Sequence, residues 1–340
     1  MESEKGGAPP EIRRPPQGSG DGLAEEQVMS EVHLGCPPHQ FAPYISHFTV
    51  SVPSRFDRTS GNSSSTEAKV CEVDEDGDLI LTRRGRPRKG YFVVSIKHNI
   101  TSSIPKVGLQ VWRAELVLAD FVLHMMYRSP NFDGITALEL GAGTGLVGML
   151  LACNANTVYI TDVGEDVLGN CSKNIHLNVG IFHRKASVYV RELDWNCSWP
   201  PEIDISLPSE QSYHWSESDV AKVRRASLIF AADVIYDEKL TDAFFSVLKS
   251  IMFNDPQKVL YLALEKRYNF TLDDLDVVAN GYSHFRSYIR DEEGADEDDD
   301  LPHGFIGRPI VLREIPQYVR EYDRGNDVEL WQIKYVNPRT

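Results

Sequence analysis

The sequence has few cysteines and no long apolar run. Five cysteines stand among 340 residues and none forms a Cys-x-x-Cys pair, which disfavours a disulfide framework or a zinc knuckle and favours a reducing compartment. The best apolar run, Leu116 to Met126, contains Asp120 and is too short to span a bilayer. The first residues lack the basic-then-apolar pattern of a signal sequence. We therefore expect no membrane span and no metal site.

Basic residues are fewer than acidic ones. The chain has 35 Lys and Arg against 50 Asp and Glu, a net charge of −15, which argues against a protein that coats nucleic acid with its whole surface. Eight of the acids lie in residues 291–300 (DEEGADEDDD), whereas residues 83–89 (RRGRPRK) hold five bases and no acid. One acidic block and one basic block thus interrupt a mildly acidic chain.

Composition divides the chain near residue 90. Residues 1–90 are rich in Pro, Gly, Ser and charge, which predicts a largely disordered tail. One segment within it, His39 to Val52, has enough aromatic and β-branched residues for a strand that docks on the rest. We expect residues 91–340 to form one folded domain that opens with a strand at Tyr91–Ile96 and carries the acidic block as a loop.

Helical and strand patterns alternate through this domain. A helix with one buried face is predicted from Val111 to Tyr127, and the last segment, residues 327–336, has strand composition without a helix of its own. Because parallel strands need long crossovers, the alternation predicts an α/β fold: a mostly parallel sheet, helices on both faces and an antiparallel last strand. The strands are expected at 135–140, 157–162, 187–193, 226–234 and 258–265, with helices from about 145, over 164–178 and over 237–252.

A glycine turn follows the first of these parallel strands. Gly141, Gly143 and Gly145 stand where open α/β sheets bind ligands, and glycines let the backbone approach a ligand closely. Asp162 ends the next strand, where a carboxylate can accept both hydroxyls of a ribose. The pattern predicts a cofactor that contains adenosine.

Two cofactors compete for this turn. The stretch from Gly143 to Gly148 matches G-x-G-x-x-G, which suits a dinucleotide and an NAD-dependent oxidoreductase. Glu139, two residues before the first glycine, would repel a pyrophosphate but suits the cationic sulfonium of S-adenosylmethionine. Asp194 and Trp195 follow the third strand, where the acid can accept from the adenine amine and the indole can cover the ring. These features favour S-adenosylmethionine.

Taken together, the motifs resemble those of the family 16 lysine methyltransferases. The motifs are VW (111–112), LELGAGTGLVG, TDVG, LDW, AADVIYD and EKR (265–267), and the resemblance runs from about Lys97 to the C-terminus. It implies a Rossmann-like sheet of seven β-strands and transfer of methyl from S-adenosyl-L-methionine to a lysine ε-amine of a protein. A small-molecule or nucleic-acid methyltransferase, and a catalytically weak scaffold acting through protein contacts such as chaperones, stay open as alternatives.

The resemblance also assigns site residues. Asp233 and Tyr236 stand at the family's D-x-x-Y motif beside the target amine, where Asp233 is expected to orient the amine rather than deprotonate it. Other interpretations stay open: the two tryptophans can be core or surface aromatics, Tyr236 a packing residue, and Glu139 a cap of the turn. The residues expected around the cofactor are Trp112, Glu139, Gly141, Ala142, Gly143, Asp162, Asp194, Trp195 and Ala232.

The charged blocks suggest a compartment and partners. Residues Arg84 to Lys89 resemble an AT-hook that contacts the minor groove of DNA, a nuclear import signal, or a solvated linker. The first two place the protein in the nucleus, with the cytoplasm left open, and favour a nucleic-acid-associated protein substrate. The acidic block is a solvated loop or steers a basic substrate. The insertion 196–225 is a candidate for substrate recognition, although its residues do not show how.

Overall fold

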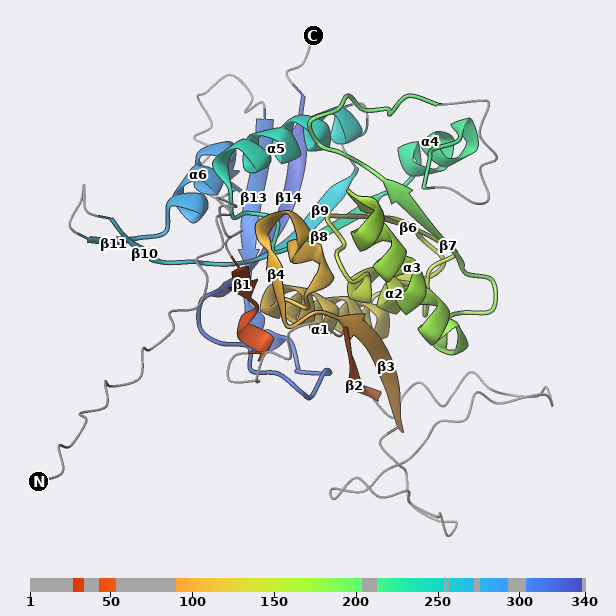
Figure 1. Ribbon diagram of the computed structural model, residues 1–340. Helices are drawn as coiled ribbons and strands as arrows, with labels where there is room; N and C mark the ends of the chain where they lie inside the picture. The colour runs from red at the N-terminus through yellow and green to blue at the C-terminus, as the bar shows by residue number, and fades with distance from the viewer. Residues whose placement is uncertain are drawn as a thin grey trace, which may run out of the picture.

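The centre of the protein is a single twisted sheet with helices on both faces (Figure 1). The computed structural model describes residues 27–33, 43–52, 90–203, 213–253, 255, 257–271, 276–292 and 304–337. The strand order is β12-β13-β14-β9-β8-β5-β6-β7. No helix within these ranges is long and apolar enough to cross a membrane. The parallel strands are β5 (Thr136–Leu140), β6 (Thr157–Asp162), β7 (Ser187–Glu192), β8 (Leu228–Ala232) and β9 (Val259–Glu265).

The last strand of the chain runs antiparallel to both of its neighbours in the sheet. β14 (Val328–Val336) pairs antiparallel with both β9 and β13 (Gly304–Ile310), which confirms the predicted direction of the last strand. The sheet has one strand more than the expected seven, because β12 (Ile289–Asp291) pairs parallel with β13. The sequence did not reveal β12, at the edge of the sheet, or β13 beside it, since β12 has three residues and β13 contains Gly307 and Pro309, both disfavoured in strands.

The two faces of the sheet bury separate hydrophobic cores. Successive residues of β5 point to opposite faces, so Ala137 packs in one core and Leu138 in the other. Helices α1 (Arg113–Arg128), α2 (Leu146–Leu151) and α3 (Glu165–Asn178) contribute to the first core. Helices α4 (Glu217–Arg224), α5 (Glu238–Met252) and α6 (Asn280–Tyr288) contribute to the second. This arrangement confirms the Rossmann-like α/β class.

Two segments that precede residue 90 belong to this fold. β2 (Tyr44–Val52) pairs antiparallel with β3 (Gly90–His98) along its whole length, and β1 (Gln27–Met29) pairs with β4 (Thr101–Ser103). A short 3-10 helix, η1 (Glu31–His33), follows β1 and stacks His33 on His98 with ring centroids 4.4 Å apart. The folded part therefore begins before residue 91, since Phe48 and Val50 are buried. The basic segment Arg84–Lys89 and residues 293–300 of the acidic block lie outside the described ranges.

The described parts of the insertion 196–225 pack against the sheet. Trp215 stacks on Tyr159 of β6 with ring centroids 5.9 Å apart. Asp219 of α4 accepts hydrogen bonds from the Tyr159 hydroxyl (2.8 Å) and from Arg191 Nε (2.9 Å). These residues fill the second core, which gives this part of the insertion a structural role; residues 204–212 lie outside the description.

Candidate active site

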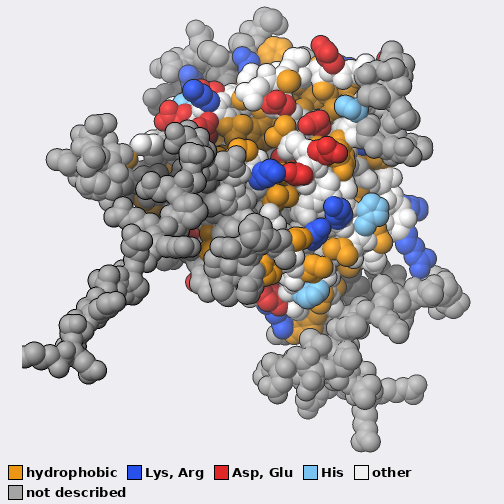
Figure 2. Space-filling view, in the orientation of Figure 1, with side chains coloured by type: hydrophobic (Ala, Val, Ile, Leu, Met, Phe, Trp, Pro, Cys, Tyr) orange, Lys and Arg blue, Asp and Glu red, His pale blue; other side chains and the backbone are white. Residues whose placement is uncertain are grey.

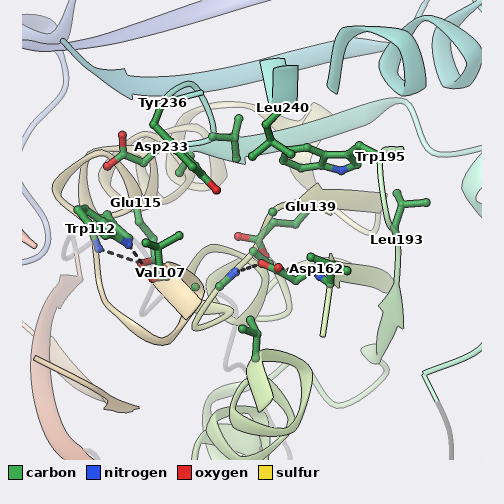
Figure 3. Close-up of a pocket in the computed structure, with 18 of the residues that line it drawn as sticks. Val107, Trp112, Glu115, Glu139, Asp162, Leu193, Trp195, Asp233, Tyr236 and Leu240 are labelled. Carbon is green, nitrogen blue, oxygen red and sulfur yellow. Dashed lines mark hydrogen bonds between the residues drawn. The ribbon is translucent and has the colours of Figure 1, made fainter. Parts of the chain in front are cut away.

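A cavity of about 250 Å³ opens at the carboxyl end of the parallel strands (Figure 3). It lies over the turns that follow β5, β6, β7 and β8, where open α/β sheets place their ligands. All eleven residues singled out from the sequence line it, although they come from five separate segments. They are Trp112, Glu139, Gly141, Ala142, Gly143, Asp162, Asp194, Trp195, Ala232, Asp233 and Tyr236.

The turn after β5 brings bare backbone to the cavity wall. Gly141 and Gly143 have φ values of +63° and +52°, in the left-handed region that favours glycine. A Cβ atom on Gly141 would lie 2.7 Å from Cγ1 of Val234, and one on Gly143 would lie 3.0 Å from the carbonyl oxygen of Gly108. Neighbouring atoms of the protein thus fill the space behind both glycines, and residues with side chains do not fit at these two positions.

Asp162 links the turn to the end of β6. Its Oδ2 accepts a hydrogen bond from Gly143 N and its Oδ1 one from Val163 N, both at 2.7 Å. Each carboxylate oxygen has a second lone pair, so the group can still accept two hydroxyl donors from the cavity. Burial raises the pKa of Asp162, and the two backbone donors oppose that rise. These two free acceptor positions fit the two hydroxyls of the ribose of an adenosine cofactor.

Two buried carboxylates support the opening of α2. Glu139 accepts from Gly148 N (2.8 Å), and Glu115 accepts from the Thr144 hydroxyl (2.7 Å). Burial raises the pKa of Glu139 well above its usual value and that of Glu115 to about 7. Glu139 was predicted to face a cationic cofactor or to cap the turn; it lines the cavity, and its Oε2 also holds the start of α2. No sequence pattern distinguished Glu115, because acids are common in the first turn of helices.

Aromatic side chains lie at opposite ends of the group of residues drawn in Figure 3. The indole nitrogen of Trp112 donates to the carbonyl of Val107 at 3.0 Å. Trp195 packs edge-to-face on Phe244 with ring centroids 5.1 Å apart, and its six-membered ring reaches Gly141. Next to it, Asp194 Oδ1 accepts from the backbone and side-chain nitrogens of Asn196, both at 2.9 Å. Trp195 thus offers a flat apolar surface beside the glycine turn.

Asp233 is tightly held by a residue that the sequence analysis missed. Its carboxylate accepts from both terminal nitrogens of Arg267, at 2.8 and 2.6 Å, and its side chain is 2% exposed. Its backbone has a φ of 57°, which an additional hydrogen bond from its N–H to Ala263 O (2.8 Å) stabilises. Asp233 was expected to orient the amine, and both of its oxygens also accept from a guanidinium. Arg267 lies in the EKR motif, but the letters alone did not reveal its partner.

Tyr236 reaches into the cavity beside Asp233. Its hydroxyl points toward the cavity centre (Figure 3), and the residue is 41% exposed. Burial of the hydroxyl and the nearby acids Asp162, Asp237 and Asp233 raise the pKa of Tyr236 to about 12. The hydroxyl therefore stays protonated near neutral pH and can donate or accept one hydrogen bond.

The fold and this site define an enzyme that holds an adenosine cofactor at the edge of a doubly wound sheet. The chain belongs to the lysine methyltransferase family, whose model matches residues 94–207 and 209–276. It is similar to methyltransferase-like protein 22 of Mus musculus, with 36% identity over 92% of this chain and 84% of the relative. The same-named protein of Homo sapiens is 33% identical over 80% of this chain and 73% of the relative.

A third relative is named for its activity. Protein N-lysine methyltransferase METTL21A of Danio rerio is 31% identical over 48% of this chain and 62% of its own length. The chain is accordingly a protein-lysine N-methyltransferase with S-adenosyl-L-methionine as its methyl donor. These findings confirm the family predicted from the motifs and the choice of this cofactor over a dinucleotide.

Proposed function

We propose that this enzyme methylates the ε-amine of a lysine in a non-histone nuclear protein. The observation that carries the proposal is the convergence of Asp162 and Trp195 on one side of a single cavity with Asp233 and Tyr236 on the other. One half offers hydrogen-bond acceptors and an aromatic surface for an adenosine. The other half offers a fixed carboxylate and a phenol for an amine. A methyl donor and an amine would therefore meet between the halves.

On the cofactor side, the chain supplies binding and orientation. Asp162 would accept from the ribose hydroxyls, Trp195 would cover the adenine, and Asp194 would accept from the adenine amine. The backbone of Gly141, Ala142 and Gly143 would approach the cofactor closely, and Trp112, Glu139 and Ala232 complete the wall. When bound, S-adenosyl-L-methionine supplies the electrophilic methyl group on its sulfonium.

On the substrate side, the chain aligns the amine. Methyl transfer is an in-line displacement, so the protein gains rate mainly by holding the nitrogen in line with the methyl carbon and the sulfur. The ion pair with Arg267 fixes the Asp233 carboxylate at the cavity wall. Tyr236 lines the cavity, is 41% exposed and would contact the alkyl chain of the lysine with its ring. A fixed wall of this kind orients an amine and leaves the proton to other acceptors.

The charge pattern supports a nuclear, basic substrate. Residues 83–89 hold five bases and would act as an import signal or contact DNA. The acidic block and the net charge of −15 favour encounter with a basic partner. On the face drawn in Figure 2, acidic and basic side chains of the described residues are interspersed, so this face has no single-sign patch to steer a partner. The steering would come from residues 291–300.

The proposal is tested with matched nuclear and cytosolic protein extracts. Each is incubated with the full chain and S-adenosyl-L-methionine labelled in its methyl group, and the labelled proteins are hydrolysed and assayed for methyl-lysine. We expect the strongest labelling in a nuclear non-histone protein and none with Asp233→Ala. Labelling confined to histones or to the cytosolic extract would overturn the choice of substrate.

A further inference from the structure

Three carboxylates from distant parts of the chain meet behind Asp233. Carboxylate oxygens of Glu31, Asp233 and Glu265 lie within 4.8 Å of one another. Asp233 lines the cavity, Glu265 ends β9, and Glu31 opens the 3-10 helix η1. Glu31 precedes the stretch that matches the family model, which begins at residue 94. A segment that precedes the stretch matched by the family model thus places an acid behind Asp233.

Two oxygens of this cluster lack a partner. Oε2 of Glu31 and Oε2 of Glu265 are buried and accept no hydrogen bond from any described residue. Glu265 is 7% exposed, so its carboxylate is largely removed from water. One of its oxygens accepts a hydrogen bond from the protein and the other does not. A buried acceptor of this kind is costly unless a donor arrives. The cluster therefore favours a ligand that brings N–H or O–H donors.

Two arginines that contact these carboxylates limit the kind of ligand that the cluster can bind. Arg113 donates to Oε1 of Glu265, and Arg267 binds both oxygens of Asp233 and lies 3.8 Å from Glu31. Three carboxylates face two guanidinium groups, so one negative charge is uncompensated. Burial, followed by the charge of Glu31, raises the pKa of Glu265 to about 7, as expected where acids outnumber the cations that face them.

A singly charged ammonium fits the one uncompensated negative charge of this cluster better than a metal ion. A lysine ammonium carries one charge and three N–H donors on a slender stem, which matches two unsatisfied acceptors and one excess charge. Calcium requires six to eight oxygen ligands and magnesium an octahedron. In this cluster the two guanidinium groups already occupy both oxygens of Asp233 and one of Glu265.

We propose that Glu31 and Glu265 bind the ammonium group of the substrate lysine and deliver it beside Asp233. The inference rests on the proposed function and adds two residues that determine specificity. The segment that carries Glu31 is firmly anchored: Ser30 N donates to Oε1 of Gln110 at 2.8 Å, the Ser30 hydroxyl donates to Val111 O, and β1 pairs with β4. Residues 27–33 thus hold Glu31 in a fixed place behind Asp233.

The first arm of the test uses the wild-type full chain and a small probe. n-Butylammonium has the length and charge of a lysine side chain, whereas n-pentanol has a similar length and no charge. We expect n-butylammonium to inhibit methyl transfer competitively with the protein acceptor and n-pentanol to be at least about tenfold weaker, since a lost charge-assisted hydrogen bond weakens binding by that factor or more. Equal inhibition by the two probes would overturn the inference without any variant.

The second arm uses Glu31→Gln, with Glu314→Gln as its matched control, since Glu314 is exposed on a separate 3-10 helix. For Glu31→Gln we expect KM for the acceptor protein and the inhibition constant of n-butylammonium to rise about tenfold, with kcat and the Kd of S-adenosyl-L-methionine unchanged. Glu31→Asp should recover part of the loss, and Glu314→Gln should match the wild type.

The outcomes separate the two proposals. If the wild type forms methyl-lysine but Glu31→Gln keeps the wild-type KM, the lysine site is wrong and the proposed function stands. If the wild type forms no methyl-lysine in any acceptor, the proposed function itself is wrong. Loss of activity in EDTA that Mg²⁺, Mn²⁺ or Ca²⁺ restores would make the cluster a metal site and overturn the inference.

Discussion

Removing Arg267 should leave a buried charge without a partner. We consider Arg267→Met, which keeps much of the apolar stem and deletes both hydrogen bonds to Asp233, at 2.8 and 2.6 Å. The chain offers a close control in Arg286→Met. Arg286 also binds both oxygens of an aspartate, Asp291, at 3.0 and 2.9 Å. Each arginine also lies over a tryptophan ring, at 5.1 Å for Arg267 and 4.7 Å for Arg286.

The two pairs differ in the burial of the acid. The side chain of Asp233 is 2% exposed and that of Asp291 is 56% exposed, while the two arginines are 31% and 29% exposed. Breaking a buried pair costs about 3–5 kcal/mol, and partial access of water at Arg267 favours the lower end, about 3 kcal/mol. An exposed pair contributes about 0–1 kcal/mol. We therefore predict a difference of about 2 kcal/mol or more between the variants.

Urea unfolding followed by circular dichroism measures both free energies of unfolding. We also expect the double variant Arg267→Met, Asp233→Asn to recover part of the loss, because it removes the unpaired charge. Equal costs for Arg267→Met and Arg286→Met, or a double variant less stable than Arg267→Met alone, would refute the argument from burial.

Three further changes test other parts of the structure. Gly141→Ala should raise the Kd of S-adenosyl-L-methionine about tenfold or more in calorimetry, because a Cβ at a φ of +63° would lie 2.7 Å from Val234; an unchanged Kd would contradict this. Burial and then the charge of His98 lower the pKa of His33 to about 4. As the pH falls, His33 therefore takes up a proton in the unfolded segment before it does so in the folded one. The stability of residues 27–33 should fall by about 2 kcal/mol from pH 7.5 to 5. Hydrogen exchange of these amides, corrected for intrinsic rates, should rise on acidification, and a flat profile would count against it. Asp120→Ala should cost about 3 kcal/mol or more in urea unfolding, because this buried carboxylate accepts from two backbone amides and from Arg324; a cost below about 1 kcal/mol would disprove its role.

The cofactor side of the site could be predicted because its constraints lie within short stretches of chain. The turn from Gly141 to Gly145 needs left-handed backbone, and few residue types accept that conformation. Asp162 follows a strand of clear pattern, so its place at the sheet edge follows from the parallel topology. In such cases the identity of a residue already limits its geometry.

The substrate side could not be predicted in the same way. Arg267 and Glu31 are ordinary charged residues, and their importance comes from partners far along the chain: Asp233 for the first, and Asp233 with Glu265 for the second. Packing brings these groups together, and no local spacing encodes it. The early segment that carries Glu31 also lies in a region whose composition is typical of disorder, so its place becomes visible in its pairing with β4 and its contacts with Gln110.

The central claim is that this cavity transfers methyl groups from S-adenosyl-L-methionine to lysine. The most direct measurement incubates the full chain with a nuclear extract and S-adenosyl-L-methionine that carries a deuterated methyl group, followed by peptide mass spectrometry. We predict deuterated methyl groups on lysine with the wild type and none with Asp233→Ala, although both bind the cofactor in calorimetry. Deuterated methyl on residues other than lysine, or equal labelling with both proteins, would contradict the account.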